Sequence, residues 1–318
     1  MHIVAGHCLS AFDWHALEAQ GRALKIFFGN GSVLFVFIAG YLFQYLSGKY
    51  LVKKYFSSKL KNVIIPYFLM SLPAIYFFTW VKQRDGVWPG FYEDPQWLQI
   101  IHFYLTGMQL TPYWFIPMII LFYIISPLLN YLDKKPYFYY SIPVFIIISC
   151  FTVRGGYLAP ISFIHFFSVY LLGMWCSHFR ININVYLIKL KVMLLLLVLG
   201  IVFFILEYLY MQGTMTWLNL LQKIVFCFFG VGFLCRYQAI FDNEILTNIA
   251  NYSFGIYFIH SYIISAVKVC IKKIYGYDYT GSIVLWLLFS LVVLLICIFL
   301  IWIIKHIFRE KSRYIIGS

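Results

Sequence analysis

Long apolar runs separated by short polar or basic connections make up most of this chain. A helix that crosses a bilayer needs about 20 mostly apolar residues, and on this measure the sequence holds ten candidate spans. They cover approximately residues 1–12, 31–48, 62–81, 112–132, 137–153, 158–177, 190–210, 216–235, 251–270 and 282–304. The pattern predicts an all-α integral membrane protein, a polytopic bundle of about ten transmembrane helices, in which residues 1–318 form a single transmembrane domain.

Two segments depart from the regular pattern. The first apolar run is too short to cross a bilayer, so we expect a truncated first helix. The stretch from Gln96 to Gln109 is amphipathic but too interrupted by polar residues to span, which favours an interfacial or re-entrant position.

Composition and charge agree with a lipid environment. The chain is 63% hydrophobic and 11% charged, whereas soluble domains are about 45–50% apolar and about 25% charged. The net charge of +13 would suggest a nucleic-acid partner in a soluble protein, but here the basic residues lie between apolar runs. We therefore predict the lipid bilayer as a partner and no nucleic acid.

The basic residues also predict orientation. They concentrate in the connections on one side of the bundle, at 49–61, 134–135, 180–191 and 305–313. Because cytoplasmic connections carry an excess of Lys and Arg, both termini are expected in the cytoplasm. The cysteines show no C-x-x-C pair and no neighbouring ligand set, so we expect neither a disulfide framework nor a metal site.

His7 is the first candidate for chemistry. It places an ionisable imidazole inside the first apolar run, and an intramembrane ionisable residue is a functional-site hypothesis. On a helix it lies about 9 Å from the chain start, in the predicted cytoplasmic half of the membrane. An imidazole there can accept a hydroxyl proton and later release it. The alternative is a hydrogen-bonded packing residue between helices.

The connection from Lys49 to Lys61 is the second candidate, because it carries five lysines. One interpretation is an ordinary cytoplasmic connection. The other is a cradle for the phosphates of a nucleotide-bearing donor, which requires cationic groups of this kind.

Six stretches, in this order, resemble the membrane-bound acyltransferase 3 family. They are Val4–His7, Leu34–Phe43, Lys59–Tyr67, Tyr113–Ile116, Tyr170–Gly173 and Asn251–His260. Each stretch alone is a weak apolar pattern, but their order and spacing together are fairly specific and cover nearly the whole chain.

The resemblance implies a multi-pass enzyme of the bacterial inner (cytoplasmic) membrane that moves an acyl group from cytoplasmic acyl-CoA to a sugar hydroxyl. In the family the first-helix histidine is catalytic, which corresponds to His7, and a basic motif contacts the donor, which corresponds to Lys59 and Lys61. The sequence departs from the family in two respects. Members usually carry an arginine about eleven residues, or about 16 Å of helix, before the histidine, whereas only six residues precede His7 here. Arginines are also commoner where this loop has lysines.

Three further intramembrane residues are candidates for substrate binding. Trp114 is either a membrane-interface anchor or a stacking platform for a sugar ring. Glu207 is either a snorkelling carboxylate or a partner for an acceptor hydroxyl. His260 is either a core histidine or a group that meets the acceptor. Outside the spans, just after residue 153, Arg154 is either a loop charge or a contact for an anionic glycan on the outer face.

The resemblance implies an O-acyltransferase that moves an acetyl or succinyl group to a cell-surface polysaccharide or its lipid-linked precursor. His7 acts as general base, or first takes the acyl group itself. We expect no bound cofactor, acetyl-CoA or another acyl-CoA as co-substrate, a glycan acceptor, and polysaccharide synthase or export proteins as further partners. The alternatives are a non-catalytic polysaccharide exporter or flippase, and a synthase subunit that has kept the motifs.

Overall fold

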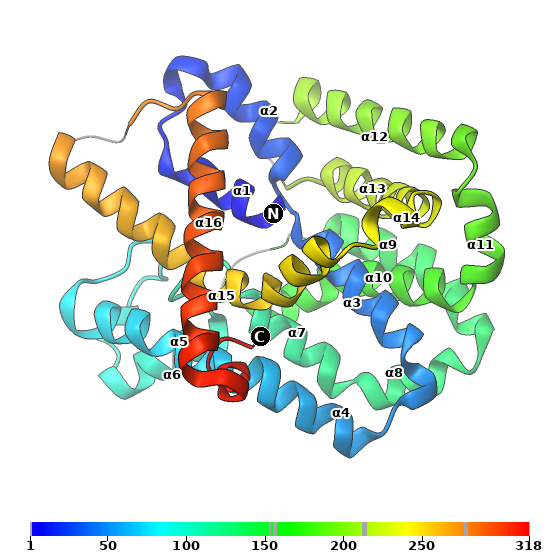
Figure 1. The fold of residues 1–318 in the computed structure, drawn as a ribbon, viewed down its shortest axis with the longest axis horizontal. Helices are drawn as coiled ribbons and strands as arrows, with labels where there is room; N and C mark the ends of the chain where they lie inside the picture. Colours follow the sequence, from blue (N-terminus) through cyan, green and yellow to red (C-terminus); the bar gives the residue numbers. More distant parts are fainter. Residues whose placement is uncertain (1, 153, 155–157, 212–214, 277–278, 318) are drawn as a thin grey trace.

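The protein is a bundle of helices in which many elements are short and several are bent (Figure 1). The computed structural model describes residues 2–152, 154, 158–211, 215–276 and 279–317. Across these ranges there is no β-strand, only an isolated bridge between Asp13 and Thr280.

Seventeen α-helices occur in the described residues. The first eight are α1 (His2–Cys8), α2 (Glu18–Phe28), α3 (Ser32–Tyr45), α4 (Val52–Lys59), α5 (Ile65–Tyr76), α6 (Gln96–Thr106), α7 (Phe115–Ile124) and α8 (Ser126–Asp133). The others are α9 (Ile142–Phe151), α10 (Ala159–His178), α11 (Arg180–Leu187), α12 (Leu190–Tyr210), α13 (Trp217–Arg236), α14 (Gln238–Phe241), α15 (Glu244–Tyr275), α16 (Ile283–Phe308) and α17 (Ser312–Ile316).

The protein is a multi-pass membrane protein. In the described part of the chain, seven helical segments are long and apolar enough to cross a bilayer. They are His15–Tyr45, Val52–Val81, Ala159–His178, Leu190–Tyr210, Trp217–Arg236, Leu246–Ile274 and Ile283–Ile316. An eighth is obtained if the pair α7 and α8 counts as one bent span. The predicted orientation of the termini stays a prediction.

Three of the ten predicted spans explain the difference in number. The first apolar run contains the seven-residue helix α1 and the short 3₁₀ turn Leu9–Ala11, which are too short to span a bilayer. The run 112–132 bends by 54° between α7 and α8, where Pro127 has no N–H to continue the helix ladder. The run 137–153 forms a shorter apolar helix, Pro136–Phe151. A further element, α2, lies in a stretch that the sequence predicted to be a connection.

Helices α3 and α10 pack together at the centre of the larger core, with backbone against backbone. A Cβ atom on Gly40 would lie 2.1 Å from the carbonyl oxygen of Tyr170, and one on Gly173 would lie 2.1 Å from that of Phe37. Only glycine permits this approach, as small residues do at membrane helix interfaces generally.

Helix α1 is enclosed by the bundle in spite of its length. Val4 and Cys8 are buried against residues of α15 and α16, and the indole N–H of Trp286 donates to the carbonyl of Ala5 at 2.9 Å. Figure 1 shows the N-terminus near the middle of the molecule, beside α16. This packing holds His7, one turn after Ile3, in the interior of the bundle.

Candidate active site

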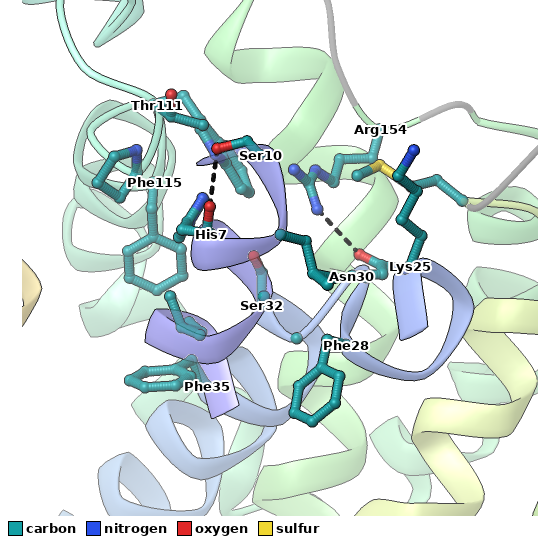
Figure 2. Close-up of a pocket in the computed structure, with 18 of the residues that line it drawn as sticks. His7, Ser10, Lys25, Phe28, Asn30, Ser32, Phe35, Thr111, Phe115 and Arg154 are labelled. Atoms are coloured by element: carbon teal, nitrogen blue, oxygen red, sulfur yellow. Dashed lines mark hydrogen bonds between the residues drawn. The ribbon is translucent and has the colours of Figure 1, made fainter. Parts of the chain in front are cut away.

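His7 lies in the last turn of α1, where the helix tightens into the 3₁₀ turn Leu9–Ala11. The hydroxyl of Ser10 donates to the carbonyl oxygen of His7 at 2.7 Å, which satisfies one of the carbonyls left free at a helix end. The half-buried imidazole faces a cavity of about 290 Å³ (Figure 2). Its ring nitrogens make no hydrogen bond to any residue that the structure describes, so they are free to meet a ligand.

The cavity is walled by apolar side chains and carries a few polar groups, as small-molecule sites generally do. Its walls come from α1 and the turn after it, from the end of α2, the start of α3 and the turn between them, from the start of α7 and the segment before it, from Arg154, from Met215 and from α15. The polar side chains in the wall are those of His7, Ser10, Lys25, Asn30, Ser32, Thr111 and Arg154. Apolar and aromatic contacts come from Ile3, Leu9, Phe28, Phe35, Pro112, Trp114, Phe115, Met215 and Tyr257.

The Gly29-Asn30-Gly31 turn lets the chain pass directly beside α1. Asn30 has a φ of +54°, a left-handed conformation that asparagine tolerates better than most residues. A Cβ atom on Gly31 would lie 2.8 Å from Nδ1 of His2. The break between α2 and α3 therefore places Asn30 and Ser32 in the wall of the same cavity as His7.

His7 and His260 lie next to each other, with ring centroids 5.3 Å apart. His260 is fully buried on α15, and its Nδ1 is 2.8 Å from the carbonyl oxygen of Ile256. Because a carbonyl can only accept, Nδ1 of His260 carries the proton and Nε2 presents a lone pair. Among the described residues this buried Nε2 has no hydrogen-bond partner. Two histidines predicted to function separately thus form one pair.

Arg154 brings a positive charge into the same cavity. Its guanidinium lies 4.4 Å from the ring centroid of Trp114 and donates to Oδ1 of Asn30 at 3.3 Å. Burial lowers the pKa of Arg154 to about 10, which still leaves it charged at neutral pH. Within the described residues no carboxylate pairs with it. Trp114 therefore lies in the cavity wall as the platform beneath this cation, and it also stacks on Phe166.

The two lysines predicted to bind the acyl donor point in different directions, and neither lines the His7 cavity. Lys59 is turned into the protein, with its ammonium 5.2 Å and 5.0 Å from the rings of Tyr55 and Tyr123. Lys61 lines a second, larger cavity of about 1170 Å³. The residues that line the two cavities are entirely different.

Glu207 also lies outside the wall of the His7 cavity. Its buried carboxylate accepts from Nδ2 of Asn219 at 3.0 Å and from the hydroxyl of Thr216 at 3.2 Å. Asn219 and Lys223 both donate to the carbonyl of Ile26 in the last turn of α2. The cluster thus satisfies carbonyls at the end of α2, just before the turn that contributes Asn30.

Several cavity residues were not predicted from the sequence. Lys25 and Asn30 fall in a stretch interpreted as a connection, and the only available signal was the Gly-Asn-Gly turn ahead of an apolar helix. Tyr257 lies within the recognised stretch that ends at His260 but was not singled out. Arg154 was predicted to be either a loop charge or a contact for an anionic glycan, and not a neighbour of His7.

The comparison with protein families decides the class of the chain. A family model described as an acyltransferase domain matches residues 1–302 of the 318. This chain belongs to the acyltransferase 3 family. The resemblance inferred from the six stretches is confirmed. The cavity therefore belongs to a membrane acyltransferase. No curated protein and no solved structure matches the chain.

Proposed function

We propose that this membrane acyltransferase moves an acetyl or succinyl group from cytoplasmic acyl-CoA to a hydroxyl of a cell-surface polysaccharide or its lipid-linked precursor, in the bacterial inner membrane. The observation that carries the proposal is the position of the His7 imidazole. It faces a cavity, lies beside His260 and near Arg154, and has no hydrogen-bond partner among the described residues. A base and a cation in the wall of one cavity, with a second histidine beside the base, are groups that acyl transfer to a hydroxyl can use.

In this mechanism His7 removes the proton of the acceptor hydroxyl while the hydroxyl oxygen attacks the thioester carbonyl. The tetrahedral intermediate carries a negative charge on the former carbonyl oxygen, and the Arg154 guanidinium is the cation best suited to stabilise it. The intermediate then collapses, the carbon–sulfur bond breaks, and the departing thiolate takes the proton from the His7 imidazolium. The products are the ester and free CoA, and His7 returns to its starting state.

The donor has to reach His7 from the basic side of the bundle. Asn251 lines the large cavity that contains Lys61, and His260 follows it on the same helix α15. Nine residues of α-helix separate them, or about 14 Å. In the proposal the nucleotide stays in the large cavity and the acyl-bearing arm extends along α15 toward His7. Tyr257 lies on α15 between Asn251 and His260 and also lines the His7 cavity, and the glycan would enter beside Trp114 and Arg154.

A thioester-cleavage assay tests the function. Purified protein is mixed with radiolabelled acetyl-CoA and a glycan acceptor, and the release of free CoA is followed. We expect His7→Ala to lower the rate by about 10²- to 10⁴-fold, the range that general base catalysis contributes. The matched control is His15→Ala, because the His15 side chain is 96% exposed and lies outside the His7 cavity.

The outcomes separate the proposed enzyme from its rivals. Turnover of His7→Ala at the wild-type rate would show that the catalytic assignment is wrong. If the wild-type protein releases no CoA with any glycan offered, an exporter or a non-catalytic synthase subunit becomes the better hypothesis.

A further inference from the structure

The larger cavity is strongly basic, and its two walls come from distant parts of the chain. Lys54 and Lys61 contribute from α4 and the turn that follows it. The opposite wall is the C-terminal segment, which supplies Lys305, Arg309, Lys311 and Arg313. The only carboxylate among the described lining residues is that of Glu310. Like charges held across a cavity repel one another, and a bound anion relieves that repulsion.

The C-terminal wall is docked in a fixed place. Ile316 is fully buried and Ser312 nearly so. Gly317 has a φ of +72°, and a Cβ atom there would lie 2.4 Å from the ring of Phe254 and 2.7 Å from the carbonyl oxygen of Asn62. Figure 1 shows the C-terminal turns beside the start of α5, at the end of the bundle where α4 also lies. The folded structure therefore holds the cations of this segment facing Lys54 and Lys61.

Lys305 and Arg309 show how the C-terminal segment is oriented relative to the large cavity. The Lys305 ammonium lies 4.5 Å from the ring centroid of Tyr252 and donates to the carbonyl of Asn251 at 3.4 Å. Arg309 ends α16 with a positive φ of +48°, and the 3₁₀ turn Arg309–Lys311 that follows lines the cavity. The next residues then run along the cavity rim.

The C-terminal segment also supplies guanidinium groups, which the connection from Lys49 to Lys61 lacks. A lysine is a point charge, whereas the planar guanidinium of an arginine can bind a phosphate through two parallel N–H groups. Of the two lysines predicted to bind the donor, Lys59 is turned away into the protein. Arg309 and Arg313 place guanidinium groups on the opposite wall.

We propose that the segment Lys305–Arg313 forms the second half of a nucleotide site, in which it binds the diphosphate and 3′-phosphate of the CoA donor opposite Lys54 and Lys61. The inference rests on the proposed function for the identity of the donor. The family match ends at residue 302, so this half of the site lies outside the part of the chain that the family model covers.

Equilibrium binding of two probes tests the inference. CoA and 3′-dephospho-CoA are titrated against the full-length protein in nanodiscs of neutral lipid. We expect the wild type to prefer CoA, and Arg309→Gln and Arg313→Gln each to weaken CoA binding by about fivefold, which corresponds to the loss of an exposed charge pair. In the same variants the Kd values for CoA and 3′-dephospho-CoA should lie closer together than in the wild type. Arg309→Lys and Arg313→Lys retain part of the affinity because they keep the charge.

A matched control and a lipid arm complete the experiment. Arg236→Gln removes a basic residue of the same predicted face that lies outside the cavity, and it should leave CoA binding unchanged. The thermal unfolding midpoint of each variant shows whether it is folded. In a second set of nanodiscs, phosphatidylglycerol replaces part of the neutral lipid, because a basic juxtamembrane patch also attracts anionic headgroups.

Each outcome decides the matter. If the wild type binds CoA and both glutamine variants bind it equally well, the C-terminal half of the site is disproved while the proposed function stands. If those variants instead lose only their enrichment of phosphatidylglycerol, the cavity binds lipid headgroups and the inference is likewise overturned. If the wild type does not bind CoA at all, the proposed function fails and this inference fails with it.

Discussion

The imidazole of His260 lies 5.3 Å from that of His7, centroid to centroid, although the two residues come from opposite ends of the chain. The hydrogen bond from Nδ1 of His260 to Ile256 fixes its tautomer, so that Nε2 is left with a lone pair. A lone pair beside a base can stabilise the imidazolium that forms when the base takes a proton. We therefore interpret His260 as a residue that positions and stabilises His7 and does not itself react.

Substitutions at His260 should affect turnover more than donor binding. We expect His260→Phe, which has no acceptor, to lower kcat by about 10- to 100-fold, with an unchanged KM for acetyl-CoA. His260→Gln keeps a polar group near the position of Nε2 and should retain more activity. Steady-state kinetics with acetyl-CoA as the varied substrate measure both quantities. Equal activity of the two variants, or a loss that appears only in KM, would contradict the assignment.

The close contact between α3 and α10 predicts a stability effect. Gly40→Ala and Gly173→Ala force the methyl group into a neighbouring backbone carbonyl, so each should destabilise the protein by about 1–3 kcal/mol or more. The measurement is the thermal unfolding midpoint in detergent. Gly230→Ala is the matched control, because a Cβ atom there meets nothing within 4 Å. Its midpoint should stay level or rise slightly, since alanine favours helix over glycine.

The apolar pattern predicted the membrane class and the helical fold because these depend on local composition and spacing. The pairing of His7 with His260 depends on how α1 enters the bundle, which no local pattern encodes. The separation of Lys59 from Lys61 has a simpler cause. Residues two apart on a helix do not share a face, so the spacing itself was evidence against a common site.

Helix α2 and the burial of Glu207 could not be predicted because both depend on tertiary contacts. The stretch before residue 30 is polar enough to resemble a connection, and it is held as a helix by partners far away in the chain. Lys223 and Asn219 meet its terminal carbonyls only because α13 packs beside it. The burial of Glu207 is likewise a tertiary effect, since Asn219 and Thr216 provide its hydrogen bonds.

Glu207 should therefore contribute to stability more than to substrate affinity. Glu207→Ala leaves Asn219 with one partner fewer in a buried place, and we expect a loss of about 1–3 kcal/mol. Glu207→Gln keeps an acceptor of the same shape and should lose less. Unfolding midpoints are compared with the KM for the glycan acceptor. A raised KM in Glu207→Gln with an unchanged midpoint would restore the substrate-binding role predicted from the sequence.

Arg154 gives the sharpest prediction for the acceptor side of the reaction. Its guanidinium faces the His7 cavity from the surface of Trp114 and pairs with no carboxylate in the described residues. Arg154→Met removes both the charge and the planar stack, and we expect kcat/KM for the acceptor to fall by about tenfold or more. Arg154→Lys keeps the charge but not the planar guanidinium, and its kcat/KM should lie between those of the wild type and Arg154→Met. CoA binding is the internal control, because the donor phosphates are proposed to lie in the other cavity. A loss of CoA affinity in Arg154→Met would place the donor beside Arg154 and contradict the separation of the two sites.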